Sequence, residues 1–81
     1  MDATREAGSV RSGQAQLIDP LTERELEVLA YLPTRFSNAD IGRRTFMSVN
    51  TVKTHLRNIY RKLDVGDRDA AVDRARSLGL L

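Results

Sequence analysis

The stretch from Ser48 to Leu63 constrains the fold of this chain more than any other part of the sequence. Its apolar side chains recur at intervals of three or four residues, at Val52, Leu56, Ile59 and Leu63. This spacing predicts an amphipathic helix that buries one face in a core. A second series has an interval of four residues and contains the cations Lys53, Arg57 and Arg61. We therefore expect a helix with one buried face and one cationic face that is free to contact a negatively charged partner.

The positive charge of the chain is concentrated around this helix. The whole chain has a formal net charge of +2, but residues 37–66 contain six Lys or Arg residues and only two Asp residues. The segments 1–20 and 21–36 each have a net charge of −1, and segment 67–81 has none. Such clustering is typical of a phosphate-binding surface, although a solvated helix face has the same appearance. Charge alone leaves both interpretations open.

Several classes of protein are excluded by what the sequence lacks. Its 81 residues are enough for one small domain. There are no cysteines and only one histidine, so neither a disulfide nor a Cys/His metal site is expected. The carboxylates Asp67, Asp69 and Asp73 share one stretch without a Gly-rich loop, and we expect no metal, cofactor or nucleotide site there. No signal peptide or membrane span is evident, which favours a soluble, cytoplasmic protein.

Composition divides the chain into a tail and a domain. Residues 1–19 are rich in Gly, Ser, Ala, Gln and charged side chains without a period, which predicts a flexible tail or an interdomain linker. We expect the folded domain at 20–81, as the end of a longer protein. Thr22 and Glu25 have the spacing of a capping box, so a first helix begins there. Pro33 is expected to end this helix within a residue or so.

Three further helices are predicted, and no strand. Ser37 caps a short second helix that ends near Thr45, and Ser48 caps the third helix. Asp67 caps a fourth helix that Gly79 closes. The face that this helix buries consists mostly of small residues: Ala71, Val72, Ala75 and Leu78. Such a face can pack onto the core or onto a second copy of the chain. The predicted fold class is all-α, with four helices.

Two helices joined by a short turn, the second with a cationic outer face, form a helix-turn-helix arrangement. Four segments make the pattern specific: L-T-E-R-E-L-E-V-L (21–29), S-N-A-D-I (37–41), S-V-N-T-V-K-T-H-L-R-N-I-Y-R-K-L (48–63) and R-A-R-S-L-G-L-L (74–81). In this order and spacing they resemble the LuxR-type, or GerE-like, DNA-binding domain over about residues 20–81. Within that family, L-P-T-R-F-S-N-A-D-I and the 48–63 stretch look most like the large, MalT-like regulators.

The resemblance implies a four-helix domain of a bacterial-type transcription regulator, whose third helix enters the major groove of double-stranded DNA. The family's base-reading positions fall on Lys53, Thr54 and Arg57. Its phosphate-binding positions fall on Thr22, Asn38, Ser48, Asn50, Thr51 and Lys62. Many relatives dimerise through the fourth helix, which here implies a homodimer contact at Val72 and Ala75. The resemblance also implies an N-terminal sensor or regulatory domain in the full-length protein.

The sequence departs from the family pattern at a few positions that bear on stability. Gly42 replaces a common Ala, and we expect it to weaken the second helix by about 1 kcal/mol. Thr45 replaces a usual core Leu, and Phe46 or Met47 is expected to compensate for the lost apolar burial. Asp64 stands where a left-handed Gly is common. None of these positions lies on the predicted DNA-reading face.

Other functions fit parts of the sequence. A protein-interaction or oligomerisation module would bind an acidic partner with the same basic face. A sigma-factor-like promoter-reading domain shares the helix-turn-helix plan, but the C-terminal helix that ends in L-G-L-L argues against it. An enzyme has no support, because His55 lies at the edge of the apolar series without a nucleophile or paired acid to use it. No catalytic residue is therefore assigned.

Overall fold

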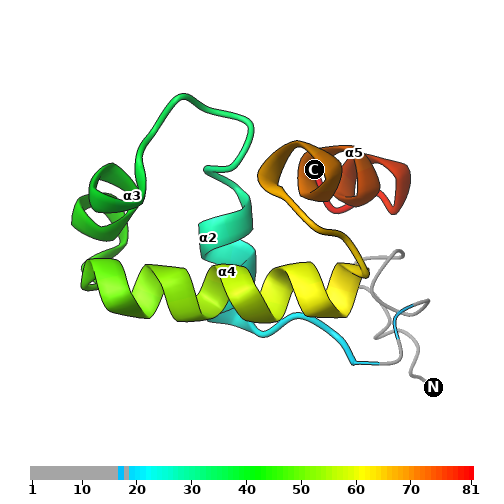
Figure 1. Cartoon of the computed structure of the whole chain (residues 1–81), viewed down its shortest axis with the longest axis horizontal. Helices are drawn as coiled ribbons and strands as arrows, with labels where there is room; N and C mark the ends of the chain where they lie inside the picture. The colour runs from blue at the N-terminus through cyan, green and yellow to red at the C-terminus, as the bar shows by residue number, and fades with distance from the viewer. Residues whose placement is uncertain (1–16, 18) are drawn as a thin grey trace, which may run out of the picture.

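The long helix α4 is the element on which the other helices pack. The computed structural model describes residue 17 and residues 19–81, so most of the predicted 1–19 tail lies outside the described residues. Within them the chain forms four helices and no strand: α2 (Glu23–Leu29), α3 (Asn38–Thr45), α4 (Val49–Leu63) and α5 (Arg68–Ser77). Figure 1 shows the arrangement. The prediction of an all-α, four-helix domain is confirmed.

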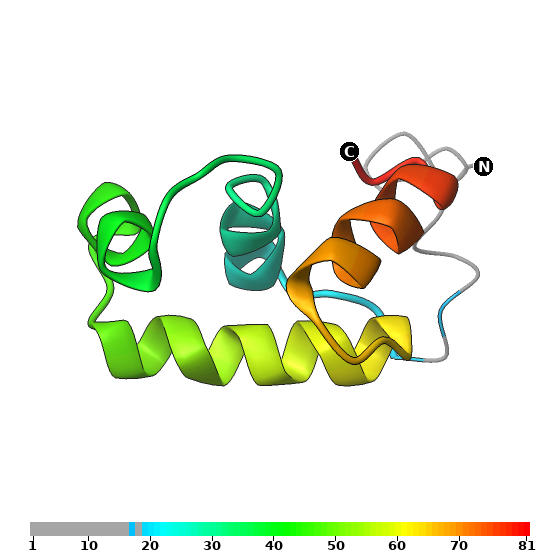
Figure 2. The same cartoon turned by 45° about the horizontal axis from the view of Figure 1, so that its top comes forward.

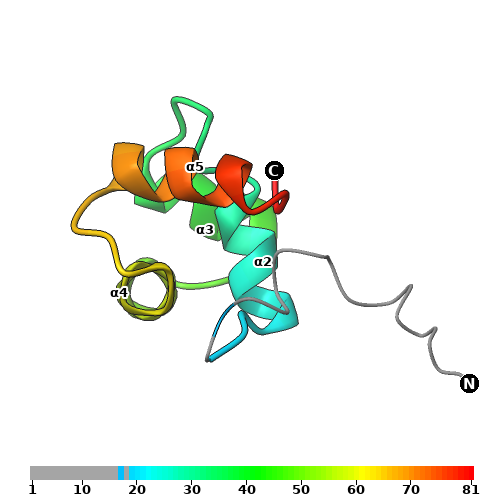
Figure 3. The same cartoon turned by 90° about the vertical axis from the view of Figure 1, so that its right-hand side faces the viewer.

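The three shorter helices all lie on one side of α4. Figure 2 shows α3, α2 and α5 in this order along its length. Figure 3, in which α4 is seen end-on, shows that none of these three helices covers its opposite face. The side that they cover is the predicted apolar stripe, and each of its four side chains is buried. These pack with apolar residues of the other helices and of the segments that flank them, chiefly Leu21, Val28, Leu29, Leu32, Ile41, Ala71, Val72, Ala75, Leu78 and Leu80.

The predicted caps begin the helices where expected. The N–H of Thr22 donates to Glu25 Oε1 at 2.9 Å, and the N–H of Glu25 donates back to Thr22 Oγ1 at 3.1 Å. Ser37 and Asp40 form a second capping box at the start of α3. The backbone N–H of Ser37, which donates to Asp40, holds the pKa of the Asp40 carboxyl below its ordinary value. Both boxes satisfy amides that have no partner inside the helix.

The first helix ends earlier than Pro33 alone predicts. After Leu29 the N–H groups of Tyr31 and Leu32 bond to carbonyls three residues back rather than four. Such tightening is common at a helix end, and proline disfavours helical backbone at the residue before it. The segment from Ala30 to Phe36 therefore forms a loop that Arg68 holds in place. The Arg68 guanidinium donates to the carbonyls of Tyr31, Leu32, Thr34 and Phe36 at 2.9–3.2 Å.

The turn between α3 and α4 explains Gly42 and corrects the expectation for Phe46. A Cβ added at Gly42 would lie 2.5 Å from the carbonyl oxygen of Met47, so the turn requires glycine at this close approach. Thr45 is buried, and its hydroxyl donates to the Ile41 carbonyl at 2.7 Å. Met47 packs against the core, but Phe46 is 95% exposed with a left-handed backbone (φ 60°). The expectation that Phe46 could replace the missing core leucine is therefore wrong.

Helix α5 uses its small residues inside the domain. Ala75 has no exposed surface and Val72 only 8%, because both face the core. Little surface of either residue is therefore left for a second copy, and the homodimer contact predicted there stays a prediction. The exposed residues of α5 are polar: Asp69, Asp73, Arg74, Arg76 and Ser77. After α5, Gly79 adopts a positive φ and the N–H of Leu80 bonds to the Ala75 carbonyl, which closes the helix as predicted.

Candidate nucleic-acid interface

The face of α4 opposite the other described helices presents two cations that have no partner among the described residues. Lys53 and Arg57 are exposed, and they are one turn apart. Among the residues that the structure describes, neither side chain forms an ion pair or a hydrogen bond. Thr54 is exposed beside them. Long cationic side chains without protein partners can donate to acceptors on another molecule at no cost in internal bonds.

The start of α4 adds hydroxyl and amide groups to this face. Ser48 is the N-cap, and its Oγ accepts from the Thr51 N–H at 3.1 Å. The Ser48 hydroxyl also donates to Thr51 Oγ1 at 2.9 Å, which engages its proton. The Thr51 hydroxyl donates to no described residue, so its own proton is free for an outside acceptor. Asn50 is exposed one position away. The structure thus places six of the predicted contact residues in one continuous stretch, from the N-cap of α4 to Arg57.

Two further predicted phosphate contacts belong to other helices. Thr22 is the exposed N-cap of α2, and its Oγ1 accepts from the Glu25 N–H and donates to none of the described residues. Asn38 is the first residue of α3 and is half-buried. The N-terminus of a helix has free amides that suit an anionic oxygen. These positions are separate in sequence from the cations of α4, and nothing in the described contacts joins them to Lys53 or Arg57.

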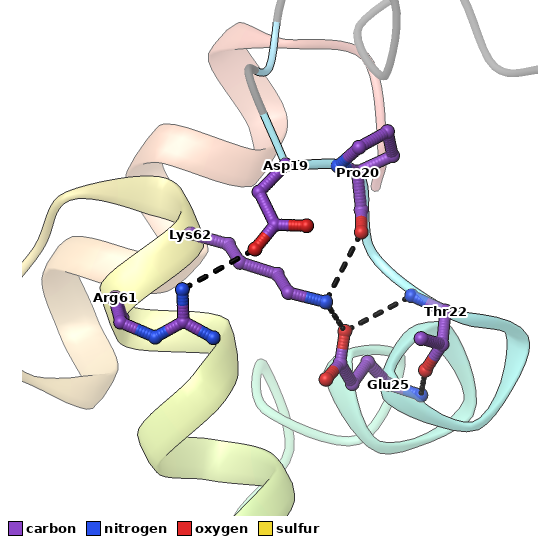
Figure 4. Close-up of polar contacts among 6 residues, drawn as sticks. All are labelled: Asp19, Pro20, Thr22, Glu25, Arg61 and Lys62. Carbon is purple, nitrogen blue, oxygen red and sulfur yellow. Dashed lines mark hydrogen bonds and ion pairs between the residues drawn. The ribbon is translucent and has the colours of Figure 1, made fainter.

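Lys62 is bonded inside the domain, unlike Lys53 and Arg57. Its Nζ donates to Glu25 Oε1 at 2.7 Å and to the Pro20 carbonyl at 3.1 Å (Figure 4). The Lys62 side chain is only 8% exposed, and that of Glu25 is 4% exposed. A lysine in such a pair would have to leave a buried carboxylate uncompensated to reach a phosphate. In the free chain Lys62 therefore has a structural role, and its phosphate contact stays a prediction that this buried pair disfavours.

Helical geometry indicates only part of this difference. At about 100° per residue, Arg57 lies about 130° and Thr54 about 170° from the centre of the apolar stripe, whereas Lys62 and Lys53 each lie about 90° from it, on opposite flanks. Lys62 is thus at the flank of the buried face, where a neighbouring helix covers it. The partner itself had no signal in the sequence, because Glu25 was already assigned to the capping box.

Arg61 is tied to the segment before α2. Its guanidinium donates to Asp19 Oδ2 at 3.2 Å, and both side chains are largely exposed. Together with the bond from Lys62 to Pro20, this contact attaches residues 19–20 to the C-terminal end of α4 (Figure 4). The cationic series of α4 is therefore divided, because its first two members are free and its third is paired.

Comparison with known proteins agrees with this geometry. Residues 19–75 match the family described as bacterial regulatory proteins, luxR family. A solved structure described as the response regulator ChrA of a heme-sensing two-component system matches with a TM-score of 0.75 and 37% sequence identity. The match covers 98% of this chain and 39% of that chain. No helix in the described part of the chain has the length and apolar content needed to cross a membrane. The chain therefore belongs to the luxR family of DNA-binding transcription regulators.

Proposed function

We propose that this chain binds double-stranded DNA in a sequence-specific manner, with α4 in the major groove. The observation that supports this most directly is the unpaired state of Lys53 and Arg57 on the one face of α4 that no helix covers. An α-helix fits the major groove of B-DNA, and its outward side chains then reach the base edges. The apolar stripe on the opposite face keeps α4 fixed to the scaffold while it does so.

The two cations would read guanine. Lysine and arginine donate to the O6 and N7 acceptors of guanine, which is the commonest specific contact in the major groove. Lys53 and Arg57 are four residues apart on a helix that is 15 residues long, so they would address neighbouring base pairs. Thr54 lies between them in sequence and faces the same groove.

Neutral groups at the helix starts would set the register on the phosphate backbone. Asn50 and Thr51 are exposed at the first turn of α4, and the Thr51 hydroxyl has a free proton. Ser48 orients that hydroxyl instead of donating to phosphate itself. Thr22 and Asn38 would supply contacts from α2 and α3. Contacts of this kind position a protein on DNA without reading its sequence.

The wider setting of the domain is part of the proposal. The chain spans 39% of the response regulator that it matches, which leaves room in a longer, cytoplasmic protein for an N-terminal sensor or regulatory domain. The resemblance to MalT-like regulators remains a prediction. A homodimer would address two half-sites about one helical turn apart. In such a dimer the polar, exposed side of α5 would form the contact, since Val72 and Ala75 face the core.

A titration with labelled DNA tests the proposal. Duplexes enriched from a randomised pool are compared with an unselected duplex by fluorescence anisotropy, at about 50 and about 200 mM salt. We expect tighter binding to the enriched duplex, and at least a tenfold loss of affinity at the higher salt, because bound cations release counterions. A folded chain that binds no DNA at low salt would contradict the proposal and would favour an acidic protein as the partner of the basic face.

A further inference from the structure

The hydroxyl of Thr54 is turned back onto its own helix. Thr54 Oγ1 donates to the carbonyl oxygen of Asn50 at 3.1 Å, four residues earlier. A threonine side chain has few rotamers in a helix, and a bond to this carbonyl selects among them. The side chain is nevertheless exposed, between Lys53 and Arg57 on the uncovered face of α4. Its conformation is therefore set before any partner arrives.

This bond limits what Thr54 can do in a groove. The hydroxyl proton is engaged, so Thr54 cannot donate to the acceptors of guanine or to O4 of thymine without breaking the bond to Asn50. What remains for contact is the methyl group, together with the free lone pair of the oxygen. In the major groove, the complementary apolar group is the C5 methyl of thymine.

We propose that Thr54 selects a thymine by contact between its methyl group and the thymine C5 methyl. The inference rests on the proposed function, and it adds a base identity to it: the preferred sequence contains a thymine between or beside the guanines that Lys53 and Arg57 contact. Because its hydroxyl donates to Asn50, Thr54 would contact the base through its methyl group, although threonine is a polar residue. Removing one buried methyl contact weakens binding by about three- to tenfold.

A pair of substitutions separates the methyl from the hydroxyl. Thr54→Val keeps a methyl in place and removes the hydroxyl, whereas Thr54→Ser keeps the hydroxyl and removes the methyl. Thr34→Ser makes the same chemical change in the loop before α3, away from α4, and is the matched control. Circular dichroism establishes that each variant is as helical as the wild-type chain.

The DNA is altered in the same way. A duplex enriched from a randomised pool by the wild-type chain is resynthesised with each thymine replaced in turn by deoxyuridine, which lacks only the C5 methyl. Dissociation constants are measured by fluorescence anisotropy at one salt concentration. For the wild-type chain we expect one replacement to weaken binding by about three- to tenfold and the others to have little effect. We expect Thr54→Val to bind like the wild type and to keep that sensitivity.

The serine variant gives the decisive result. Thr54→Ser is expected to bind the thymine duplex about as weakly as the wild type binds the deoxyuridine duplex, and to be indifferent to the replacement. Insensitivity of the wild type to every deoxyuridine, or a loss with Thr54→Val but not with Thr54→Ser, overturns the inference and leaves DNA binding intact. A wild-type chain that enriches no duplex overturns both this inference and the proposed function.

Discussion

The two ends of α4 carry the same kinds of cation and use them in opposite ways. Lys53 and Arg57, nearer the N-terminus of α4, are exposed and have no partner among the described residues. Lys62, at the other end, is buried against Glu25, and Arg61 pairs with Asp19. The first pair of cations makes no contact that would stabilise the described fold, whereas Lys62 neutralises a buried carboxylate.

The difference shows that the surroundings of a charged side chain decide whether it stabilises the fold or is available for binding. Exposed cations are solvated in the free protein, and they can contact a phosphate or a base without breaking a bond inside the protein. A buried lysine and carboxylate have both lost their water, so each depends on the other. Substitutions along α4 should therefore separate into those that affect stability and those that affect binding.

The largest expected effect is from Lys62→Met. Removal of the lysine leaves the Glu25 carboxylate buried without a partner, which should lower the free energy of unfolding by about 3–5 kcal/mol. Urea denaturation followed by circular dichroism measures the change. The double variant Glu25→Gln/Lys62→Met should regain much of the loss, because neither charge remains. A single variant with wild-type stability would mean that the pair is not buried in solution.

The next effect concerns binding rather than folding. Lys53→Ala and Arg57→Ala should each weaken binding to an enriched duplex by about 1–3 kcal/mol and relax its sequence preference. Their free energies of unfolding should stay within about 0.5 kcal/mol of the wild-type value, since neither side chain has an internal partner. Anisotropy titrations on enriched and random duplexes give the comparison. Equal losses on both duplexes would show that these cations contact phosphate instead of bases.

The residues that flank α4 allow stability to be changed without touching any cation. Phe46 before the helix and Asp64 after it both have left-handed backbones, with φ of 60° and 59°. Phe46→Gly should raise the free energy of unfolding by about 1 kcal/mol, because the strain is relieved and the exposed ring loses no burial. Asp64→Gly should act in the same direction. DNA affinity should be unchanged in both variants. A change in affinity together with stability would contradict the separation of folding stability from DNA binding.

The smallest effect is expected from Arg61→Ala. The pair with Asp19 is exposed, and such pairs contribute roughly 0–1 kcal/mol. We expect losses below about 0.5 kcal/mol in both the unfolding and the DNA-binding measurements. A loss in binding as large as that of Arg57→Ala would extend the reading face of α4 by a turn and would show that the contact with Asp19 opens on DNA.

Local chemistry made much of the fold predictable. The cap of each helix joins residues three positions apart, as Thr22 and Glu25 or Ser48 and Thr51 do, so the pattern is complete within a short stretch. The apolar stripe of α4 was predictable for the same reason, because one helical period places all four of its members. Membership of the LuxR-type family was recognisable from motifs that lie in the same order as these helices.

Longer-range contacts were not predictable in this way. The face of α5 that consists of small residues could pack onto the core or onto a second copy of the chain. Only the folded arrangement shows that Val72 and Ala75 face inward. Arg68 had no motif that marked it, although it holds four carbonyls of the loop before α3. The exposure of Phe46 depends on the left-handed turn, which points the residue after α3 outward and brings Met47 onto the core.

The amino-acid sequence was enough to predict where the helices begin, which face of α4 is apolar, and which family the chain resembles. These features depend on residues within one or two helical turns of each other. The tertiary structure alone decided which cations of α4 are free. Lys62 is separated from Glu25 by 37 residues in the sequence, and the two meet because α2 packs against α4. Burial of that pair holds Lys62 inside the domain in the free chain and leaves Lys53 and Arg57 as the centre of the candidate interface.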